Sequence, residues 1–332
     1  MIRDLFSKRV AGLVFVGIAC LTAIPAAAQE SEATYQIMPV LEPGEYALTQ
    51  ATSSDISTQV IGRTIPYRNG HSFTWNLAVE PQDEAGKQKV ILTLARVRSR
   101  IVTSELDAEY DSDKAENSNP QFKHMHLVFR GFMKHPFTVT LDANGKVIGI
   151  DRFQETKAAI LATIDEPASK AGAEKFLDET TKMLSQNKNF FTGGHDFFPP
   201  DGAPVKVGET WKNNMVADVP TIGAVATTNE STLQAVDVVN GDPIATVATK
   251  AGSPDLSALK KDPNRPTRIK KAEIGGTIVT KINLKTRQLL TVAESKSLDV
   301  EVEMPNPQNP QGPPLSAVLT GNAKSGVRLD RK

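Results

Sequence analysis

Two long segments near the C-terminal end of the chain alternate between apolar and polar residues, and few folds contain strands of this length. In residues 290–304 the even positions carry most of the large apolar side chains, and in residues 315–329 the odd positions do so. Successive side chains of a β-strand point to opposite faces, so each segment predicts a long strand with one buried face. Residues 274–282 show the same alternation. Three such strands in succession predict an antiparallel meander.

The N-terminal half of the chain contains the same alternation in shorter segments. Residues 73–79 and 90–103 predict two strands joined by a turn. Residues 137–141 and 146–150 predict a hairpin whose connection, Asp142–Gly145, has the Asp, Asn and Gly residues that tight turns prefer. This half is therefore also expected to form antiparallel sheet.

Residues 151–190, between the two halves, have the pattern of two helices. Their apolar residues recur at helical spacing and are Phe153, Ile160, Leu161, Ile164, Phe176, Leu177, Met183 and Leu184. We predict a mainly β fold of the α+β class, in which two antiparallel curved sheets or half-barrels flank this central two-helix segment. The predicted organisation is an N-terminal lobe (29–150), a helical insert (151–190) and a C-terminal lobe (191–332), with the lobes either separate or parts of one domain.

The first 28 residues have the three parts of a secretory signal peptide. Arg3, Lys8 and Arg9 precede an apolar run at residues 10–24, and Ala26-Ala27-Ala28 supplies a small-residue cleavage site. We predict cleavage between Ala28 and Gln29 and a periplasmic or secreted mature protein. Alternatives are a retained anchor and a lipoprotein modified at Cys20. No later segment approaches the length of a membrane span, so no transmembrane span is expected in the mature chain.

Charge and cysteine content exclude several functions. The chain has 38 Lys and Arg against 38 Asp and Glu, and the predicted signal peptide removes more basic than acidic residues. A nucleic-acid partner is therefore not expected, because such proteins carry a basic excess. Cys20 is the single cysteine, so the mature chain is expected to contain no disulfide and no thiolate site.

Three of the five histidines fall in residues 124–135 together with Met125 and Met133. Imidazole and thioether groups suit copper, so His124, His126 and His135 are candidate metal ligands. The surrounding residues are mostly apolar, however, and the alternative is core packing with histidines at its edge. Because the ligand set is incomplete, we predict no bound metal.

Arg96, Arg98 and Arg100 alternate along one predicted strand and therefore share a face. Their guanidinium groups form a candidate anion patch for phosphate or carboxylate. The alternative is a solvated face on which acids of the neighbouring strand pair with the arginines. Of the two interpretations, the solvated, paired face is the one that we expect.

No sequence motif for a cofactor or a catalytic centre is present. The chain lacks G-x-S-x-G, H-E-x-x-H, G-x-G-x-x-G and the P-loop pattern. His195-Asp196 follows two glycines and is a candidate acid–base pair, but catalysis would also need a nucleophile or a metal beside it. We therefore predict no cofactor and no catalytic residue, with an unrecognised hydrolase as the third functional hypothesis.

One segment supports a family resemblance. Residues 204–211 read Pro-Val-Lys-Val-Gly-Glu-Thr-Trp, which is similar to the Pro-Val-x-Val-Gly-Asp/Glu-x-Trp signature of an uncharacterised family of exported bacterial proteins. Tyr110-Asp111-Ser112 after a basic strand and the hairpin sequence of residues 131–147 agree with it. The resemblance covers most of the mature chain and implies no assigned activity.

The predicted helices and sheets lead to two leading functional hypotheses. The first is non-enzymatic binding or carriage of an apolar or amphiphilic ligand of the cell envelope, such as a lipid, because a curved sheet around helices resembles the general design of periplasmic lipid carriers. The second is a structural or interaction protein without a small ligand. The predicted ligand-lining residues are Phe153, Ile160, Leu161, Phe176, Met183 and Trp211. The sequence does not predict an oligomeric state.

Overall fold

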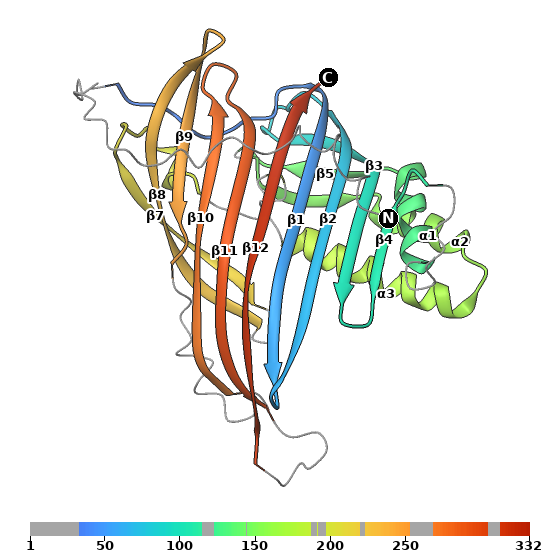
Figure 1. The fold of residues 1–332 in the computed structure, drawn as a ribbon. Helices are drawn as coiled ribbons and strands as arrows, with labels where there is room; N and C mark the ends of the chain where they lie inside the picture. Colours follow the sequence, from blue (N-terminus) through green and yellow to red (C-terminus); the bar gives the residue numbers. More distant parts are fainter. Residues whose placement is uncertain are drawn as a thin grey trace, which may run out of the picture. The chain divides into compact units, whose positions relative to one another are not determined.

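The long alternating segments form one antiparallel β-sheet. The computed structural model describes residues 33–114, 123–143, 145–186, 191, 197–219, 223–252, 268–304 and 313–332. Within these ranges, twelve strands join a single sheet (Figure 1). The strands are β1 (Gly44–Val60), β2 (Arg63–Val79), β3 (Gln88–Thr103), β4 (Asp107–Asp111), β5 (Phe137–Leu141), β6 (Val147–Asp151), β7 (Thr210–Val219), β8 (Gly223–Val239), β9 (Asp242–Lys250), β10 (Arg268–Asn283), β11 (Gln288–Met304) and β12 (Leu315–Arg331). The predicted mainly β fold is confirmed.

The strand order places the first and last long strands side by side. It runs β6-β5-β3-β2-β1-β12-β11-β10-β9-β8-β7, and β4 pairs with β3. β1 and β12 are paired from Tyr46↔Arg331 to Val60↔Ala317, so strands of both predicted lobes belong to one sheet. Figure 1 shows the two ends of this sheet, β7–β8 and β5–β6, curving toward the side that carries the helices. The predicted signal peptide, including Cys20 and Ala28, lies outside the described residues.

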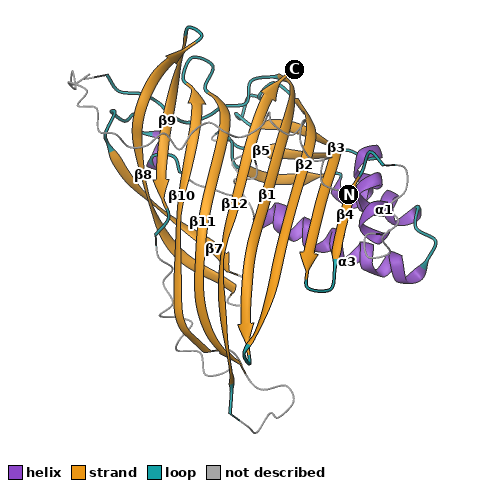
Figure 2. Ribbon diagram, in the orientation of Figure 1, coloured by secondary structure: helices purple, strands orange, loops and turns teal. Residues whose placement is uncertain are grey.

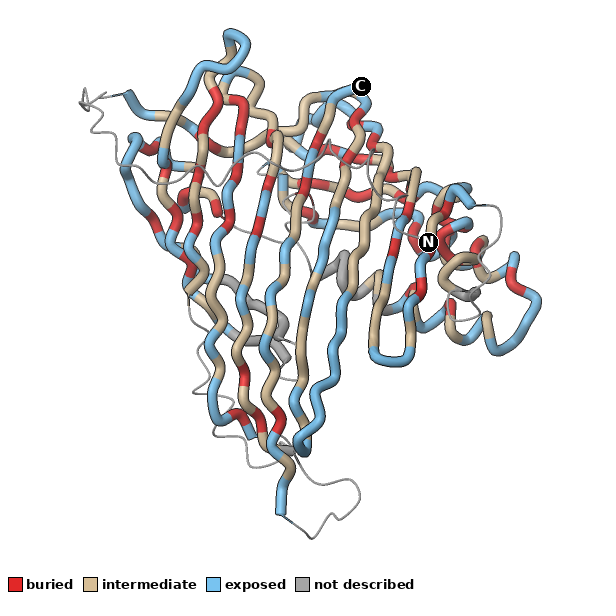
Figure 3. The backbone as a smooth tube through the Cα atoms, in the orientation of Figure 1, coloured by how far each residue is buried: buried red, intermediate tan, exposed pale blue. Residues whose placement is uncertain are grey.

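The two faces of the sheet differ in polarity. We call the face that carries the buried apolar side chains and the helices the inner face, and the opposite face the outer face. Figure 3 colours the backbone by burial, and buried, half-buried and exposed residues follow one another along the strands. On β3, Leu92 and Leu94 point inward, and after an irregularity in the pairing with β2 the inward positions continue at Val97 and Ser99. One extra residue in a strand shifts its alternation by one position. As a result, Arg96, Arg98 and Arg100 lie on the outer face.

Within the described residues, three α-helices lie against the inner face near β3, β5 and β6 (Figure 2). They are α1 (Lys123–Lys134), α2 (Phe153–Ala162) and α3 (Pro167–Gln186). None of these helices is both long and apolar enough to cross a bilayer. The helices α2 and α3 correspond to the predicted insert. Helix α1 was not predicted, although Met125, Val128, Phe129 and Phe132 have helical spacing.

Aromatic side chains fill the space between the helices and the sheet. Phe129 of α1 packs edge-on against Phe73 of β2 and Phe176 of α3, with ring centroids 5.9 and 5.8 Å apart. Phe153 of α2 packs against Phe137 of β5 at 5.4 Å. Such edge-to-face pairs are typical of a closely packed core. This end of the inner face is therefore occupied by the protein's own side chains.

Candidate functional site

The inner face beyond the helices is also apolar. Cross-strand neighbours on β2, β1, β12, β11 and β10 form two rows at the end of the sheet near the β1–β2 turn. We call these rows the distal apolar patch; they are Tyr67, Ile56, Gly321, Leu298 and Ile274, then Ile65, Thr58, Leu319, Val300 and Ala272. Val300 is buried, but Ile65 and Tyr67 are 47% and 36% exposed. The patch therefore offers apolar surface to water.

The outer face of the same strands is polar. Residues that alternate with the patch include Asp55 on β1, Asp299 on β11 and Thr320 on β12. Asp55 pairs with Arg68 at 3.0 Å, and Asp299 pairs with Lys271 at 2.8 Å. An antiparallel sheet with water on both sides needs no such asymmetry. Part of this inner face is already covered within the protein, since Val300, Val302 and Ala317 are buried in a small apolar cluster.

A band of polar side chains separates the distal apolar patch from the main core. We call it the polar belt; it consists of Asn69, His71, Ser99, Thr52, Ser54, Ser325, Glu294 and Lys296. The belt lies one row above the patch, since Ser54, Asn69 and Lys296 each precede or follow a patch residue by two positions in the same strand. The inner face is thus apolar, then polar, then apolar along the strands.

Most belt residues bond to one another. Ser54 Oγ donates to Asn69 Oδ1 at 2.7 Å, and Ser325 Oγ donates to Glu294 Oε2 at 2.7 Å. Lys296 Nζ lies 2.6 Å from Glu294 Oε1 and so balances the charge of this carboxylate. Buried polar groups need such partners, because an unpaired one costs a few kcal/mol. The belt therefore carries little net charge.

Ser99 and His71 make a contact that resembles a nucleophile and its base. Ser99 Oγ lies 2.8 Å from His71 Nδ1, and burial lowers the pKa of His71. Ser99 is only 4% exposed, and in the described part of the chain no carboxylate bonds to the other ring nitrogen of His71. A catalytic dyad needs an accessible nucleophile and an oriented base. We therefore assign this pair to the polar belt.

Two other predicted sites are placed as follows. Tyr110 Oη lies 3.0 Å from Nδ1 of His126, whereas His135 lies beyond the last residue of α1. The side chain of His124 and the pair His195-Asp196 lie outside the described residues. No cluster of three or more His, Cys, Asp or Glu side chains suited to a metal occurs among the residues that are described.

The three arginines of the candidate anion patch pair with acids of β4 and its turn. Arg96 Nη2 lies 3.0 Å from Asp111, and Arg98 Nε lies 3.2 Å from the same carboxylate. Arg100 pairs with Asp107 at 3.0 Å. The bond from Arg96 lowers the pKa of Asp111 despite its partial burial, so the carboxylate stays charged. These acids supply internal partners for all three guanidinium groups.

The predicted ligand-lining residues do not surround one cavity. Phe153 and Ile160 are buried in the helical core, and Leu161 and Phe176 pack against its edge. Trp211 lies on β7, at the other end of the strand order, where its Nε1 donates to the carbonyl of Phe197 at 3.1 Å. The side chain of Met183 is outside the described residues.

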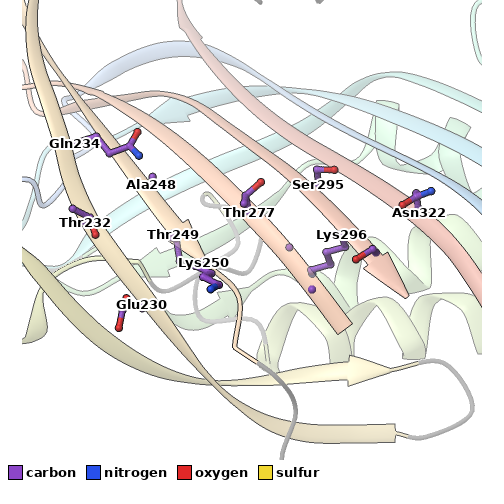
Figure 4. Close-up of a pocket in the computed structure, with 13 residues that line it drawn as sticks. Glu230, Thr232, Gln234, Ala248, Thr249, Lys250, Thr277, Ser295, Lys296 and Asn322 are labelled. Atoms are coloured by element: carbon purple, nitrogen blue, oxygen red, sulfur yellow. The ribbon is translucent and has the colours of Figure 1, made fainter. Parts of the chain in front are cut away.

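A pocket of about 550 Å³ lies on the other side of the sheet (Figure 4). It is placed where β9 ends at Lys250 while β8 and β10 continue. Its lining is Glu230, Thr232, Gln234, Ala248, Thr249, Lys250, Gly275, Gly276, Thr277, Ser295, Lys296, Ser297 and Asn322. Most of these side chains alternate with core residues such as Ile278 and Val247 and hence belong to the outer face. Sequence patterns did not predict this pocket.

Residues 86–288, more than half of the chain, match a family described as a family of unknown function (DUF6263). The chain belongs to this family. The membership fits the predicted resemblance to an uncharacterised family and assigns no activity. No curated protein matches the chain.

Solved structures resemble the chain only weakly. Lipovitellin, in a structure that describes lipid–protein interactions, is 10% identical with a TM-score of 0.39; the match covers 88% of this chain and 25% of that one. The chain thus spans about a quarter of lipovitellin. DynF from the dynemicin biosynthesis pathway of Micromonospora chersina is 10% identical with a TM-score of 0.18, covering 89% and 84%. The translocator domain of the autotransporter NalP from Neisseria meningitidis is 10% identical with a TM-score of 0.18, covering 88% and 90%.

Proposed function

We propose that this chain is a non-enzymatic binding protein that carries an apolar or amphiphilic ligand on the inner face of its sheet. The observation that carries the proposal is the distal apolar patch, where Ile65 and Tyr67 are exposed and Leu298 and Leu319 are half-buried. The main contacts of the described helices are with β3, β5 and β6. Contiguous apolar surface of this kind is typical of binding sites.

The neighbouring polar belt favours an amphiphile over a purely apolar ligand. A chain lying along β11 from Lys296 to Val302 would follow the strand for roughly 20 Å, at about 3.3 Å per residue. One leaflet of a bilayer has a hydrocarbon depth of roughly 15 Å, half of the 30 Å core. A single acyl chain with its polar end at Lys296 and Ser54 would therefore cross both rows of the patch and extend toward Val302, which is buried in the apolar cluster beyond them.

Burial of the half-exposed side chains supplies the driving force. Complete burial of one Leu or Ile side chain contributes about 1.5–3 kcal/mol, and covering a half-buried one contributes about half of that. Several such side chains, including Ile56, Ile274 and Leu298, would be covered at once. The summed free energy of burial exceeds the free-energy cost of immobilising a small ligand only if the ligand covers most of the patch. A long acyl chain meets this condition.

The proposal is tested by comparing two matched pairs of substitutions. Leu298→Gln with Leu319→Gln places polar groups in the patch, and Thr320→Gln with Lys324→Gln changes the outer face of β12. Native mass spectrometry with lipid extraction, and titration with a pyrene-labelled fatty acid, measure binding. We expect bound lipid or probe in the wild type and in the outer-face variant, and a loss of roughly tenfold or more in the patch variant.

Two results would contradict the proposal that the protein carries a ligand on this face. Equal binding by both variants would place the ligand elsewhere. Absence of lipid and probe from the wild type, together with self-association that only the patch variant abolishes, would support the structural or interaction protein instead.

We also propose that the protein is located outside the cytoplasm. Basic residues, an apolar run and Ala26-Ala27-Ala28 at the N-terminus have the organisation of a secretory signal. We predict that protein isolated from the native envelope begins at Gln29, and intact-mass measurement tests this prediction. A diacylated chain that begins at Cys20 would instead establish a membrane-anchored lipoprotein.

A further inference from the structure

The turn between β1 and β2 carries an isoleucine where its backbone favours asparagine or glycine. Val60 and Arg63 are the last cross-strand pair, so Ile61 and Gly62 form a two-residue turn. Their φ angles are 50° and 70°, and positive φ at both positions is typical of a type I′ turn. Such turns prefer Asn-Gly, and a β-branched residue rarely adopts a positive φ. The backbone of Ile61 is therefore strained.

The side chain of Ile61 is also open to water. It is 71% exposed, and a Cβ built on its neighbour Gly62 would meet no atom within 4 Å. An exposed apolar residue alone is common on protein surfaces, but this one also occupies a strained backbone position. Strained positions cluster at functional sites. The combination indicates that Ile61 contacts a partner outside the chain.

The turn between β8 and β9 has the same geometry and a different composition. Asn240-Gly241 follows the last cross-strand pair, Val239↔Asp242, and both turn residues have positive φ. Val238 before this turn is 76% exposed. Acids flank it, however, because Asp237 precedes it and Asp242 follows the turn. Figure 1 shows the two turns at opposite ends of the sheet. The β8–β9 turn therefore has the residues that its backbone prefers and an acidic surrounding.

The β1–β2 turn has a basic surrounding instead. Arg63 is the single charged residue of residues 56–67, and it is exposed. Among the described residues, no acid forms an ion pair with it. Glu303, the last acid of β11 at this end of the sheet, pairs with Lys270 at 2.5 Å. A positive charge is therefore available beside Ile61 for an anionic partner.

Addition of a β-strand is a poor explanation for this end of the sheet. β3 pairs with β2 only as far as Tyr67↔Thr103, so in the described structure residues 63–66 of β2 form a free edge. Pro66 lies on this edge and has no N–H group, which disfavours pairing with another chain. The partner of the turn is therefore expected to contact side chains rather than backbone groups.

We propose that the β1–β2 turn docks on an anionic lipid bilayer, with Ile61 inserted between the headgroups and Arg63 bound to lipid phosphate. Apolar burial combined with attraction to anionic headgroups is the usual driving force for such peripheral binding. Tyr67 lies near the same end of β2, and tyrosine favours the membrane–water interface. Ile65 of the distal apolar patch lies two residues from Arg63, so the turn and the patch are continuous. The inference rests on the proposed function, because docking would bring the patch to the membrane that supplies its amphiphile.

Co-sedimentation with vesicles tests the proposal. Wild type and variants, each purified in the form that the cell exports, are mixed with vesicles of phosphatidylcholine with or without phosphatidylglycerol. We expect the wild type to bind more tightly to the vesicles that contain phosphatidylglycerol. Ile61→Asn should bind both kinds at least roughly tenfold more weakly, because it loses the burial of one isoleucine. Its thermal midpoint should not fall, because asparagine suits the turn, whereas a packing role for Ile61 would lower the midpoint. Arg63→Gln should bind roughly fivefold more weakly, and only to the anionic vesicles.

Val238→Asn is the matched control, because it makes a similar change at an exposed residue of the opposite turn, and it should bind vesicles like the wild type. Titration with a pyrene-labelled fatty acid without vesicles separates docking from carriage, and Ile61→Asn should bind this probe like the wild type. Vesicle binding without probe binding would support docking and refute carriage. Probe binding without vesicle binding would overturn docking alone. Equal vesicle binding by the wild type and Ile61→Asn would also overturn it. Self-association that Ile61→Asn abolishes, without vesicle binding, would assign the turn to a second copy of the chain.

Discussion

At the scale of single residues, burial decides the chemistry of the contact between Tyr110 and His126. Burial raises the pKa of Tyr110 to about 12, so its hydroxyl keeps its proton. Burial, with a contribution from Arg130, lowers the pKa of His126, so its ring is neutral near pH 7. The tyrosine therefore donates and Nδ1 of His126 accepts, which leaves the imidazole proton on Nε2. This histidine serves packing, unlike the metal ligand that its spacing suggested.

We predict that Tyr110→Phe lowers the free energy of unfolding by about 1–3 kcal/mol, because it leaves His126 without this donor on a buried face. Urea unfolding at pH 7 measures the change. Tyr67→Phe is the matched control, since the hydroxyl of Tyr67 only accepts an exposed bond from Asn69, and it should change stability by no more than about 0.5 kcal/mol. Equal losses of stability in both variants would contradict a stabilising role for the hydrogen bond between Tyr110 and His126.

Two histidines should make stability depend on pH. Burial lowers the pKa of His71 and of His126 below their ordinary value of 6.5. As pH falls through 6.5, the unfolded chain takes up protons that the folded chain does not, so the folded state loses stability. We predict a smaller loss between pH 7.5 and pH 5.5, measured by urea unfolding, in the double variant His71→Gln/His126→Gln than in the wild type. An unchanged pH dependence would refute this explanation.

Some single-residue roles were predictable and others were not. Alternation correctly placed Arg96, Arg98 and Arg100 on one face, because that property depends only on the strand itself. The identity of their partners depends on the register of β4, which brings Asp107 and Asp111 opposite them. A period-two pattern fixes which residues of a strand share a face, but it does not distinguish registers that differ by two residues. The sequence therefore favoured a paired face but could not identify the acids that pair with these arginines.

At the scale of elements, helix α1 shows how one close contact fixes a helix pair. A Cβ on Gly131 of α1 would overlap the Cγ1 of Ile160 of α2, so the glycine allows the two helices to approach. Ile160 was predicted to line a ligand site because it lies on an apolar helical stripe. Ile160 is buried, as its place on the stripe predicts, but it packs against Gly131 of α1, a helix that the sequence analysis did not predict. Apolar stripes predict burial and leave the covering element undefined.

We predict that Gly131→Ala lowers the free energy of unfolding by about 1–3 kcal/mol, since the added methyl group must displace a fully buried side chain. Ile160→Ala should cost about 2–5 kcal/mol by leaving a cavity. In the double variant the new methyl group occupies part of that cavity, so the combined loss should fall short of the sum by roughly 0.5–3 kcal/mol. Chemical denaturation of the four proteins measures this coupling. Strict additivity would show that the contact is absent.

At the scale of the whole molecule, the pairing of β1 with β12 makes the sheet continuous. The strands β10, β11 and β12 were predictable from their own alternation, and so was their antiparallel order, because short connections join neighbours in sequence; β1 was not predicted. The pairing of Tyr46 with Arg331 joins opposite ends of the described chain, and local patterns hold no signal for it. Both the distal apolar patch and the polar belt cross this seam. Of the strands that form the candidate site, β10, β11 and β12 were therefore predictable, whereas β1 and the arrangement of the strands into one binding face were not.

The continuity of the sheet makes β12 essential to the whole fold. β12 is hydrogen-bonded to β1 on one side and to β11 on the other along most of its length. Its removal would expose the inner side chains of both neighbours, including Leu48 and Val292, and leave two long unpaired strand edges. We predict that a chain ending at Met304 shows no cooperative urea transition by circular dichroism. A chain ending at Asp330 should stay within about 1 kcal/mol of the full-length protein, because it loses only surface contacts such as that of Arg331 with Glu42. A cooperative transition at an unchanged midpoint in the shorter chain would show that the two parts of the sheet fold independently, and would place the ligand-binding face within one of them.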